Sequence, residues 1–205
     1  MEFDLGSSVV CTDGGAGRIV GLIADPVRRS LAHIAVEPEH DPGRARLVPV
    51  DLVMDAGATV VELGCTLGRF RQLPQFRDIE FVPEGVEYDD PGADFAWPAY
   101  GLATRRVAVL MDRIPAGEVE IRHREHVRGT DGAIGRVEGL IVDDAGHITH
   151  VLLEEGHLWG RKEVAIPVAS LARIDAQGIH VRLSKREIAD LPELVGSRRE
   201  EAAAS

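Results

Sequence analysis

Apolar and polar residues alternate along much of the chain in short stretches, and each stretch ends near glycine, proline or aspartate. A period of two residues is typical of β-strands. Residues 31–37 and 148–154 are largely apolar on both faces, which predicts strands that are mostly buried. The pattern predicts strands at 7–12, 18–25 and 31–37, one ending at Pro49, and two at 52–56 and 59–63. The expected fold class is therefore mainly β.

The same order of stretches recurs in the second half of the chain. Residues 12–25 (TDGGAGRIVGLIAD) return 118 residues later as residues 130–143 (TDGAIGRVEGLIVD), with nine of fourteen positions identical. We interpret the chain as a duplication. The second copy predicts further strands at 148–154, up to Pro167, at 171–175 and at 179–183, so each copy has about six short strands.

Glycines recur inside the second strand of each copy. Gly17 and Gly21 match Gly135 and Gly139. Glycine weakens a strand unless a bulge, a sharp bend or a close backbone approach requires it. We therefore expect a bend at these positions, of the kind that curls a small sheet into a barrel.

A short helix is predicted near the C-terminal end. Ser184-Lys185-Arg186-Glu187 is a capping box, and the helix should end at Leu191-Pro192. The counterpart before Leu73-Pro74 is weaker because Gly64 and Gly68 interrupt it.

These elements divide the chain into four parts. We expect a first barrel at 1–75, an aromatic and acidic connecting segment at 76–118, a second barrel at 119–195 and a flexible tail at 196–205. Such small barrels are marginally stable alone, so each should lean on its twin, on the connecting segment or on a second chain.

Both copies resemble the PRC-barrel domain, the small β-barrel of the photosynthetic reaction centre H subunit and of the C-terminal half of the ribosome maturation factor. The residues that carry the resemblance are the Asp-Gly, Gly-Arg and Gly-Leu-Ile steps above, His150-Val151-Leu152-Leu153, residues 162–167 (KEVAIP), and Leu183-Ser184-Lys185 with Leu191-Pro192. The first copy departs in its 38–46 loop and in residues 64–72. The resemblance implies a protein-interaction or assembly module without a catalytic residue set.

Charge and composition narrow the expected location and partners. The formal net charge of −11 disfavours a nucleic-acid partner, because such binding depends on lysine and arginine. Met1-Glu2-Phe3-Asp4 lacks the positive start of a signal peptide, and the longest apolar run, 107–111, is too short for a membrane span. Two cysteines outside any paired motif, Cys11 and Cys65, favour a reducing cytoplasm.

No catalytic, metal or cofactor site is expected. The histidine groups His123 with His126, and His147 with His150 and His157, lack cysteine or carboxylate companions for a tetrahedral set. The repeat-matched His33 and His150 predict neutral core histidines, with a pH switch as the alternative. Cys11 has no nearby histidine, and Asp13, Asp25, Asp131 and Asp143 lie beside turns, so we expect no enzyme.

Two groups of residues are candidate protein-binding sites. Trp159 with Arg161 and Lys162 has the composition of an interface hot spot, although Trp159 equally well plugs a barrel end. Six of the nine aromatic residues, among them Phe95, Trp97 and Tyr100, fall within residues 76–100. That segment is either an ordered strap across the barrels or a docking peptide for a partner.

The sequence as a whole predicts a cytoplasmic, non-catalytic adaptor or scaffold that binds another protein and self-associates, most simply as a homodimer. A ribosome- or RNA-associated factor and a small-ligand or metal sensor are the alternatives.

Overall fold

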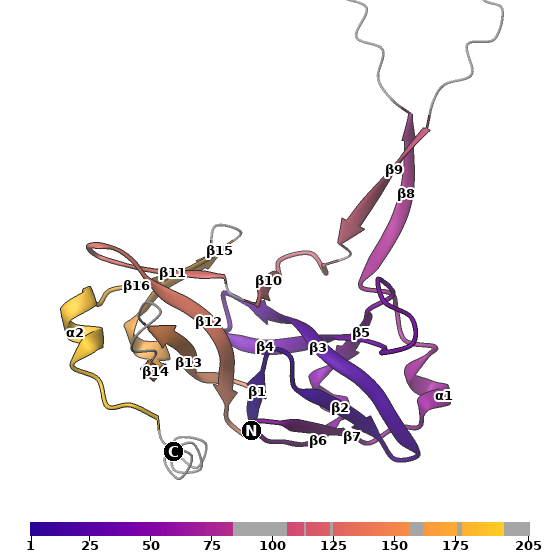
Figure 1. Cartoon of the computed structure of the whole chain (residues 1–205), viewed down its shortest axis with the longest axis horizontal. Coiled ribbons are helices and arrows are strands. Elements are labelled where there is room, and N and C mark those ends of the chain that lie inside the picture. The colour runs from indigo at the N-terminus through magenta and orange to yellow at the C-terminus, as the bar shows by residue number, and fades with distance from the viewer. Residues whose placement is uncertain (84–105, 113, 124, 156–161, 176–177, 195–205) are drawn as a thin grey trace, which may run out of the picture.

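Two seven-stranded sheets and one two-stranded hairpin form the protein in the computed structural model, which describes residues 1–83, 106–112, 114–123, 125–155, 162–175 and 178–194 (Figure 1). The N-terminal sheet has the order β5 (Arg46–Pro49), β4 (Ser30–Glu37), β3 (Gly14–Asp25), β2 (Ser8–Cys11), β7 (Val60–Leu63), β6 (Val53–Ala56). The C-terminal sheet has the order β14 (Lys162–Pro167), β13 (Ile148–Glu155), β12 (Gly132–Val142), β11 (His126–Gly129), β16 (Gly178–Val181), β15 (Leu171–Asp175). The two orders are equivalent, strand for strand.

The predicted strands are confirmed, but the sheets do not close into barrels. Among the described residues, no ladder joins β5 to β6 or β14 to β15. At the end of β5 and of β14, Pro49 and Pro167 each precede one turn of 3₁₀ helix, η1 (Val50–Leu52) and η2 (Val168–Ser170). Proline has no N–H for a ladder, so the chain turns here and leaves a gap in the hydrogen bonding.

Each sheet receives its seventh strand from the other half of the chain. β1 (Glu2–Asp4) pairs with β12 of the C-terminal sheet, and β10 (Val119–Arg122) pairs with β3 of the N-terminal sheet, both antiparallel. The two pairings are equivalent, because Phe3 lies opposite Leu140 and Ile121 lies opposite Leu22. The alternation pattern does not predict this exchange, since three or four residues are too few to show a period.

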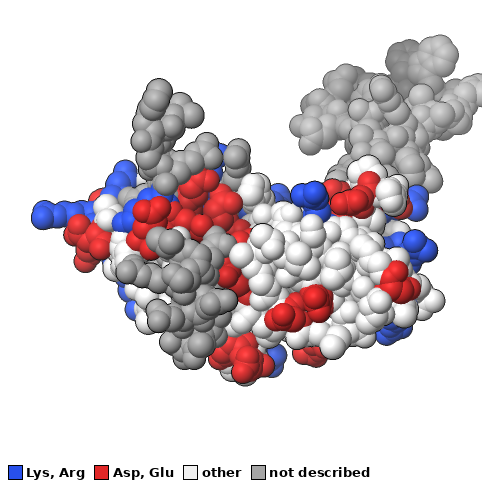
Figure 2. All heavy atoms as spheres, turned by 60° about the horizontal axis from the view of Figure 1, so that its bottom comes forward, with Lys and Arg blue, Asp and Glu red and all other residues white. Residues whose placement is uncertain are grey.

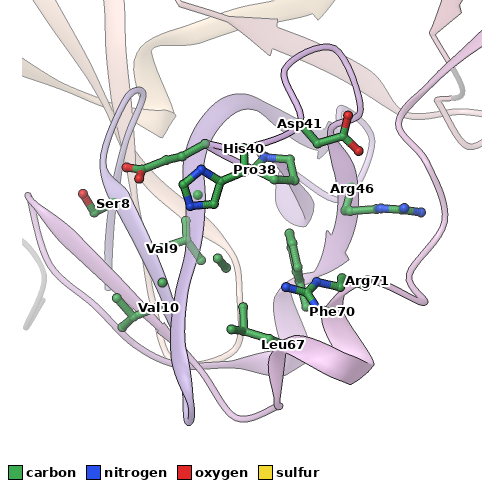
Figure 3. A pocket seen from close by; sticks show the side chains of 14 residues that line it. Ser8, Val9, Val10, Pro38, His40, Asp41, Arg46, Leu67, Phe70 and Arg71 are labelled. Atoms are coloured by element: carbon green, nitrogen blue, oxygen red, sulfur yellow. The ribbon is translucent and has the colours of Figure 1, made fainter.

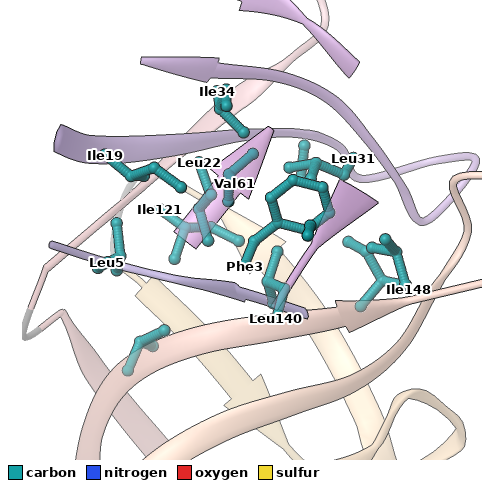
Figure 4. Packing of buried hydrophobic residues seen from close by; sticks show 14 of the residues in the cluster. Phe3, Leu5, Ile19, Leu22, Leu31, Ile34, Val61, Ile121, Leu140 and Ile148 are labelled. Carbon is teal, nitrogen blue, oxygen red and sulfur yellow. The ribbon is translucent and has the colours of Figure 1, made fainter. Parts of the chain in front are cut away.

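One hydrophobic core runs through both sheets. It joins buried side chains of both halves, and Phe3 in its middle is 0% exposed. In Figure 4, the Phe3 ring lies between Leu31 of the N-terminal sheet and Leu140 of the C-terminal sheet, with Ile148 beside it. Each unit is therefore stabilised by packing against the other unit. This is one of the arrangements expected for units that are too small to be stable alone.

Glycine is required where the exchanged strand crosses β12. A Cβ on Gly139 would lie 2.5 Å from the backbone oxygen of Phe3 and 2.6 Å from Asp4 Oδ1. A Cβ on Gly17, whose φ is +147°, would lie 2.0 Å from the oxygen of Glu37. A bend was expected at these glycines. The structure shows close backbone approaches at Gly17 and Gly139, and the ladders bulge between Ile19 and Gly21 and between Val137 and Gly139.

Two short helices follow the sheets and begin in the same way. α2 (Lys185–Ala189) has the predicted capping box between Ser184 and Glu187, and α1 (Leu67–Phe70) begins at Thr66. Asp13 Oδ1 accepts the N–H of Leu67 at 2.7 Å, and Asp131 Oδ1 accepts that of Lys185 at 3.0 Å. The carboxylates of the two Asp-Gly turns therefore bind the first turn of each helix, a structural role.

Asp25 and Asp143 hold the turns after β3 and β12. Asp143 Oδ1 accepts the N–H groups of Ala145 and His147 at 2.9 and 2.8 Å, and Asp25 Oδ1 accepts those of Val27 and Arg28 at 2.8 and 2.9 Å. These donors stabilise the charged carboxylates and lower the pKa of both. The predicted turn role of both aspartates is confirmed.

The Asp143 carboxylate in the turn after β12 makes the stability of the fold depend on pH. Because the folded-state pKa of Asp143 lies below its ordinary value of 3.8, its stabilising effect is present above that pH and is lost as the pH falls through the lowered pKa. Asp143→Ala is therefore expected to lower the urea midpoint at pH 7, and the gap from wild type should shrink in acid. Asp144→Ala, an exposed neighbour, is the matched control. An equal gap at pH 7 and in acid would contradict the turn's dependence on the charged carboxylate.

The described part of the connecting segment is a hairpin. β8 (Arg77–Pro83) pairs with β9 (Arg106–Asp112) and projects away from both sheets (Figure 1). The strap expected over residues 76–100 is thus wrong for residues 77–83, whose backbone groups pair with β9 instead of crossing a sheet. Phe76, at the start of this segment, is buried against Ile23, Ala35 and Leu47. Residues 84–100 lie outside the described residues.

Candidate functional site

The outer face of the C-terminal sheet gathers basic side chains from three strands. Arg128 of β11 lies beside His180 of β16, which lies beside Arg173 of β15. Arg128 and Arg173 are exposed, as are His126, two residues before Arg128, and Arg182, two residues after His180. We call these five residues, His126, Arg128, Arg173, His180 and Arg182, the basic face.

Part of this positive charge is unpaired. Arg173 Nε lies 2.8 Å from Asp175 Oδ2, and His180 Nε2 lies 3.6 Å from Asp175 Oδ1. Within the described residues, no carboxylate lies within ion-pair distance of Arg128 or Arg182. The guanidinium N–H donors of such exposed arginines can bind carboxylate or phosphate groups.

The equivalent face of the N-terminal sheet has a different character. Val10 of β2, Glu62 of β7 and Asp55 of β6 form the row that matches Arg128, His180 and Arg173. Two exposed apolar side chains lie on β6 and β7, Met54 at 71% and Val60 at 40% exposed. We call these five residues the acidic-apolar face. On the side of the molecule that carries β6 and β7, Figure 2 shows few charged groups over the N-terminal sheet.

The sequence analysis did not predict the basic face. Its residues are spread over residues 126–182, and they meet only because β11, β16 and β15 are neighbours in the sheet. A signal was available at alternate positions of the predicted strands, since His126 with Arg128, and His180 with Arg182, share a strand face. Comparing these positions with their counterparts in the first copy would have revealed the difference.

A pocket of about 430 Å³ opens beside the N-terminal sheet. Its apolar part comes from Val9 of β2 and from Leu67 and Phe70 of α1, while His40 reaches over it from the 38–41 loop (Figure 3). Arg71 lines it beside Phe70. The pocket has the size of a single side chain or a small ligand, and it is formed by the loop in which the first copy departs from the second.

An acidic cleft lies between the two halves. It has a volume of about 640 Å³, and its walls carry Asp4, Glu138, Glu154, Glu163 and Glu193. Within the described part of the chain, no group of three or more metal-ligating side chains is arranged to hold an ion.

The repeat-matched histidines are half-buried rather than core residues. His33 Nδ1 lies 3.1 Å from Glu118 Oε2, and His150 Nδ1 lies 3.2 Å from Thr149 Oγ1. The prediction that both histidines are core residues is therefore wrong, because the outer side of each strand leaves its histidine near polar side chains. Burial lowers the pKa of His150, so that histidine favours the neutral form.

The two cysteines are buried neighbours in the N-terminal sheet. Burial, followed by the nearby Cys65, raises the pKa of the Cys11 thiol to about 12. A thiol with this pKa is almost wholly protonated at neutral pH, which makes it a poor nucleophile.

We therefore expect slow labelling of Cys11 by iodoacetamide in the native protein and rapid labelling of both thiols in denaturant, measured by mass spectrometry. The denatured sample controls for reagent activity. Native labelling of Cys11 as fast as that of a free thiol would show that the burial argument fails.

Only one of the predicted interface residues falls in the described structure. Lys162 Nζ donates to the backbone oxygens of Ala189, at 2.9 Å, and of Leu191. The ammonium thus binds carbonyls at the C-terminal end of α2, so its interactions are internal to the protein. Trp159, Arg161, Phe95, Trp97 and Tyr100 lie outside the described residues.

Comparison with known families supports the resemblance for the second copy. Residues 124–188 match the PRC-barrel domain family model. No curated protein matches the chain. In the described part of the chain, no helix is long and apolar enough to cross a membrane.

Proposed function

We propose that this chain is a non-catalytic adaptor or scaffold built from two PRC-barrel-like units that binds another protein in the cytoplasm. The observation that carries the proposal is the contrast between the two equivalent outer faces on one rigid frame. Strand exchange and a common core hold the units together, while one face carries Arg128 and Arg173 where the other carries Val10 and Asp55. Two different docking faces at a fixed separation are what an adaptor needs.

Other features support an interaction role. A PRC-barrel match is consistent with an interaction or assembly module. The only thiol with a strongly shifted pKa in the described residues, Cys11, is shifted away from reactivity. Electrostatic complementarity sets partner choice and association rate, so the basic face favours a partner with an acidic surface.

Affinity capture with matched variants tests the adaptor role. The tagged chain is expressed in its native cells, and captured proteins are compared between wild type, Arg128→Glu/Arg173→Glu and the control Arg44→Glu/Arg69→Glu. The control makes the same change of net charge on exposed arginines of the N-terminal half. A different protein that is retained by wild type and by the control, but lost from the basic-face variant, is the expected result. If every captured protein binds all three forms equally, the basic face is not the docking site.

A ribosome- or RNA-associated factor is the second candidate, and the basic face is the observation that favours it. The net charge of −11 and the acidic cleft oppose a phosphate backbone. A mobility shift with total cellular RNA at low salt distinguishes the two proposals. RNA binding that disappears in Arg128→Glu/Arg173→Glu would favour the RNA-associated function.

A further inference from the structure

The two outer faces differ in charge at matched positions. In the N-terminal sheet, Glu62 lies beside Asp55, and in the C-terminal sheet His180 lies beside Arg173 in the same register. Arg128 adds a second guanidinium next to His180, where the first copy has Val10. The duplicated strands thus present a negative row, Asp55 with Glu62, on one unit. The matching row of the other unit carries two arginines and a histidine, with Asp175 paired to Arg173.

The negative row is also available to a partner. Asp55 and Glu62 are exposed and, among the described residues, lie within ion-pair distance of no basic side chain. Asp55 Oδ1 accepts only the N–H of the next residue, Ala56, at 2.9 Å. Beside them Met54 and Val60 expose apolar surface, which contributes to association when it is removed from water. Exposed apolar side chains next to an accessible polar row match the apolar centre and polar rim of a protein interface.

A single molecule cannot bring these two faces together. β6 and β7 lie along the lower edge of Figure 1, while β15 and β16 lie at its upper left, and the common core fixes the two sheets relative to one another. Complementary faces on different sides of one rigid body meet only between copies. The contact is then heterologous, so it closes into a ring or continues as a chain.

We infer that the acidic-apolar face of one copy docks on the basic face of a second copy, so that Asp55 and Glu62 meet Arg128, Arg173 and His180. This inference rests on the proposed interaction function and names one partner for it. Charge pairs between exposed faces are screened by salt, so association should weaken as ionic strength rises. Substitutions at exposed positions usually change stability little, so the charge-reversed variants should fold.

Charge exchange between two variants tests the contact with purified full-length protein. The first variant is Asp55→Arg/Glu62→Arg, in which both faces are positive, and the second is Arg128→Glu/Arg173→Glu, in which both are negative. Each alone should associate about tenfold or more weakly than wild type in sedimentation velocity at low salt. Their equimolar mixture should regain association, because each positive face then meets a negative one. Circular dichroism and thermal melting confirm that both variants remain folded.

Two matched variants control for the change of net charge itself. Glu39→Arg/Asp41→Arg and Arg44→Glu/Arg69→Glu change the net charge equally at exposed positions that belong to neither face and should associate like wild type. A mixture that remains monomeric, or a wild type that stays at 22.2 kDa at all concentrations, would overturn the inference. Such a result leaves the capture experiment above intact, since a different protein then occupies the basic face.

The acidic stretch of residues 84–94 is the competing occupant of the basic face. It contains Glu84, Glu87, Asp89, Asp90 and Asp94 and no basic residue. Replacing these five carboxylates with amides should leave association unchanged. Loss of association in that variant, with retention in Asp55→Arg/Glu62→Arg, would assign the basic face to this stretch and overturn the face-to-face contact.

Discussion

Replacing Phe3 with alanine is expected to lower the free energy of unfolding by about 3–5 kcal/mol. The side chain is fully buried in the common core, yet it belongs to a three-residue strand at the start of the chain. Whole domains have only about 5–15 kcal/mol of stability, so this one substitution removes a large part of it. Urea denaturation followed by circular dichroism measures the change.

The residues at which hydrogen exchange speeds up distinguish strand exchange from an ordinary core contact. Because β1 pairs with β12, hydrogen exchange in Phe3→Ala should speed up at Gly139, Leu140 and Ile141, which lie more than 130 residues away in sequence. Val27→Ala, at a side chain that is 89% exposed, is the control and should change stability by less than about 0.5 kcal/mol. Faster exchange confined to β2 and β3 would show that β1 does not pair with the C-terminal sheet.

Gly139→Ala is expected to destabilise the protein by about 1–3 kcal/mol. The new Cβ would lie 2.5 Å from the oxygen of Phe3 and 3.0 Å from the Cα of Asp4. Both neighbours are backbone atoms, so relief of the clash requires β1 to move away from β12 and to weaken their hydrogen bonds. Thermal and urea unfolding measure this loss.

The repeat supplies a matched control for this substitution. Gly21 is the equivalent glycine of β3, but a Cβ there would meet the Oε1 atom of Glu120 at 2.9 Å, the far end of a flexible side chain. Gly21→Ala should therefore cost less than Gly139→Ala, and Gly15→Ala, with no atom within 4 Å of its Cβ, should be nearly neutral. Equal losses at Gly21 and Gly139 would contradict the backbone clash.

Strands, turns and helix starts were predictable because they depend on neighbours in sequence. Alternation located the strands, the capping box located the start of α2, and the turn role of Asp143 followed from the residues beside it. These features use hydrogen bonds that span only a few residues, so a short stretch contains the information that determines them.

Partners distant in sequence were not predictable in this way. The prediction for His33 did not include its side-chain partner Glu118, because Glu118 lies 85 residues away in sequence. Closed barrels were expected from the glycine bends, but Pro49 and Pro167 leave the hydrogen bonding open beside the 3₁₀ turns. Lys162, a predicted interface residue, donates to carbonyls of Ala189 and Leu191, which lie 27 and 29 residues away in sequence.

The sequence by itself determined a duplicated, mainly β chain with its strand order repeated after 118 residues, because periodicity and turn chemistry are local and were present twice. Only the tertiary structure decided that β1 and β10 exchange sheets and that Arg128, His180 and Arg173 share one face. A strand chooses its partner through the burial of side chains in a common core, as Phe3 does against Leu140. That choice depends on the arrangement of the whole chain, so no short stretch of sequence contains it.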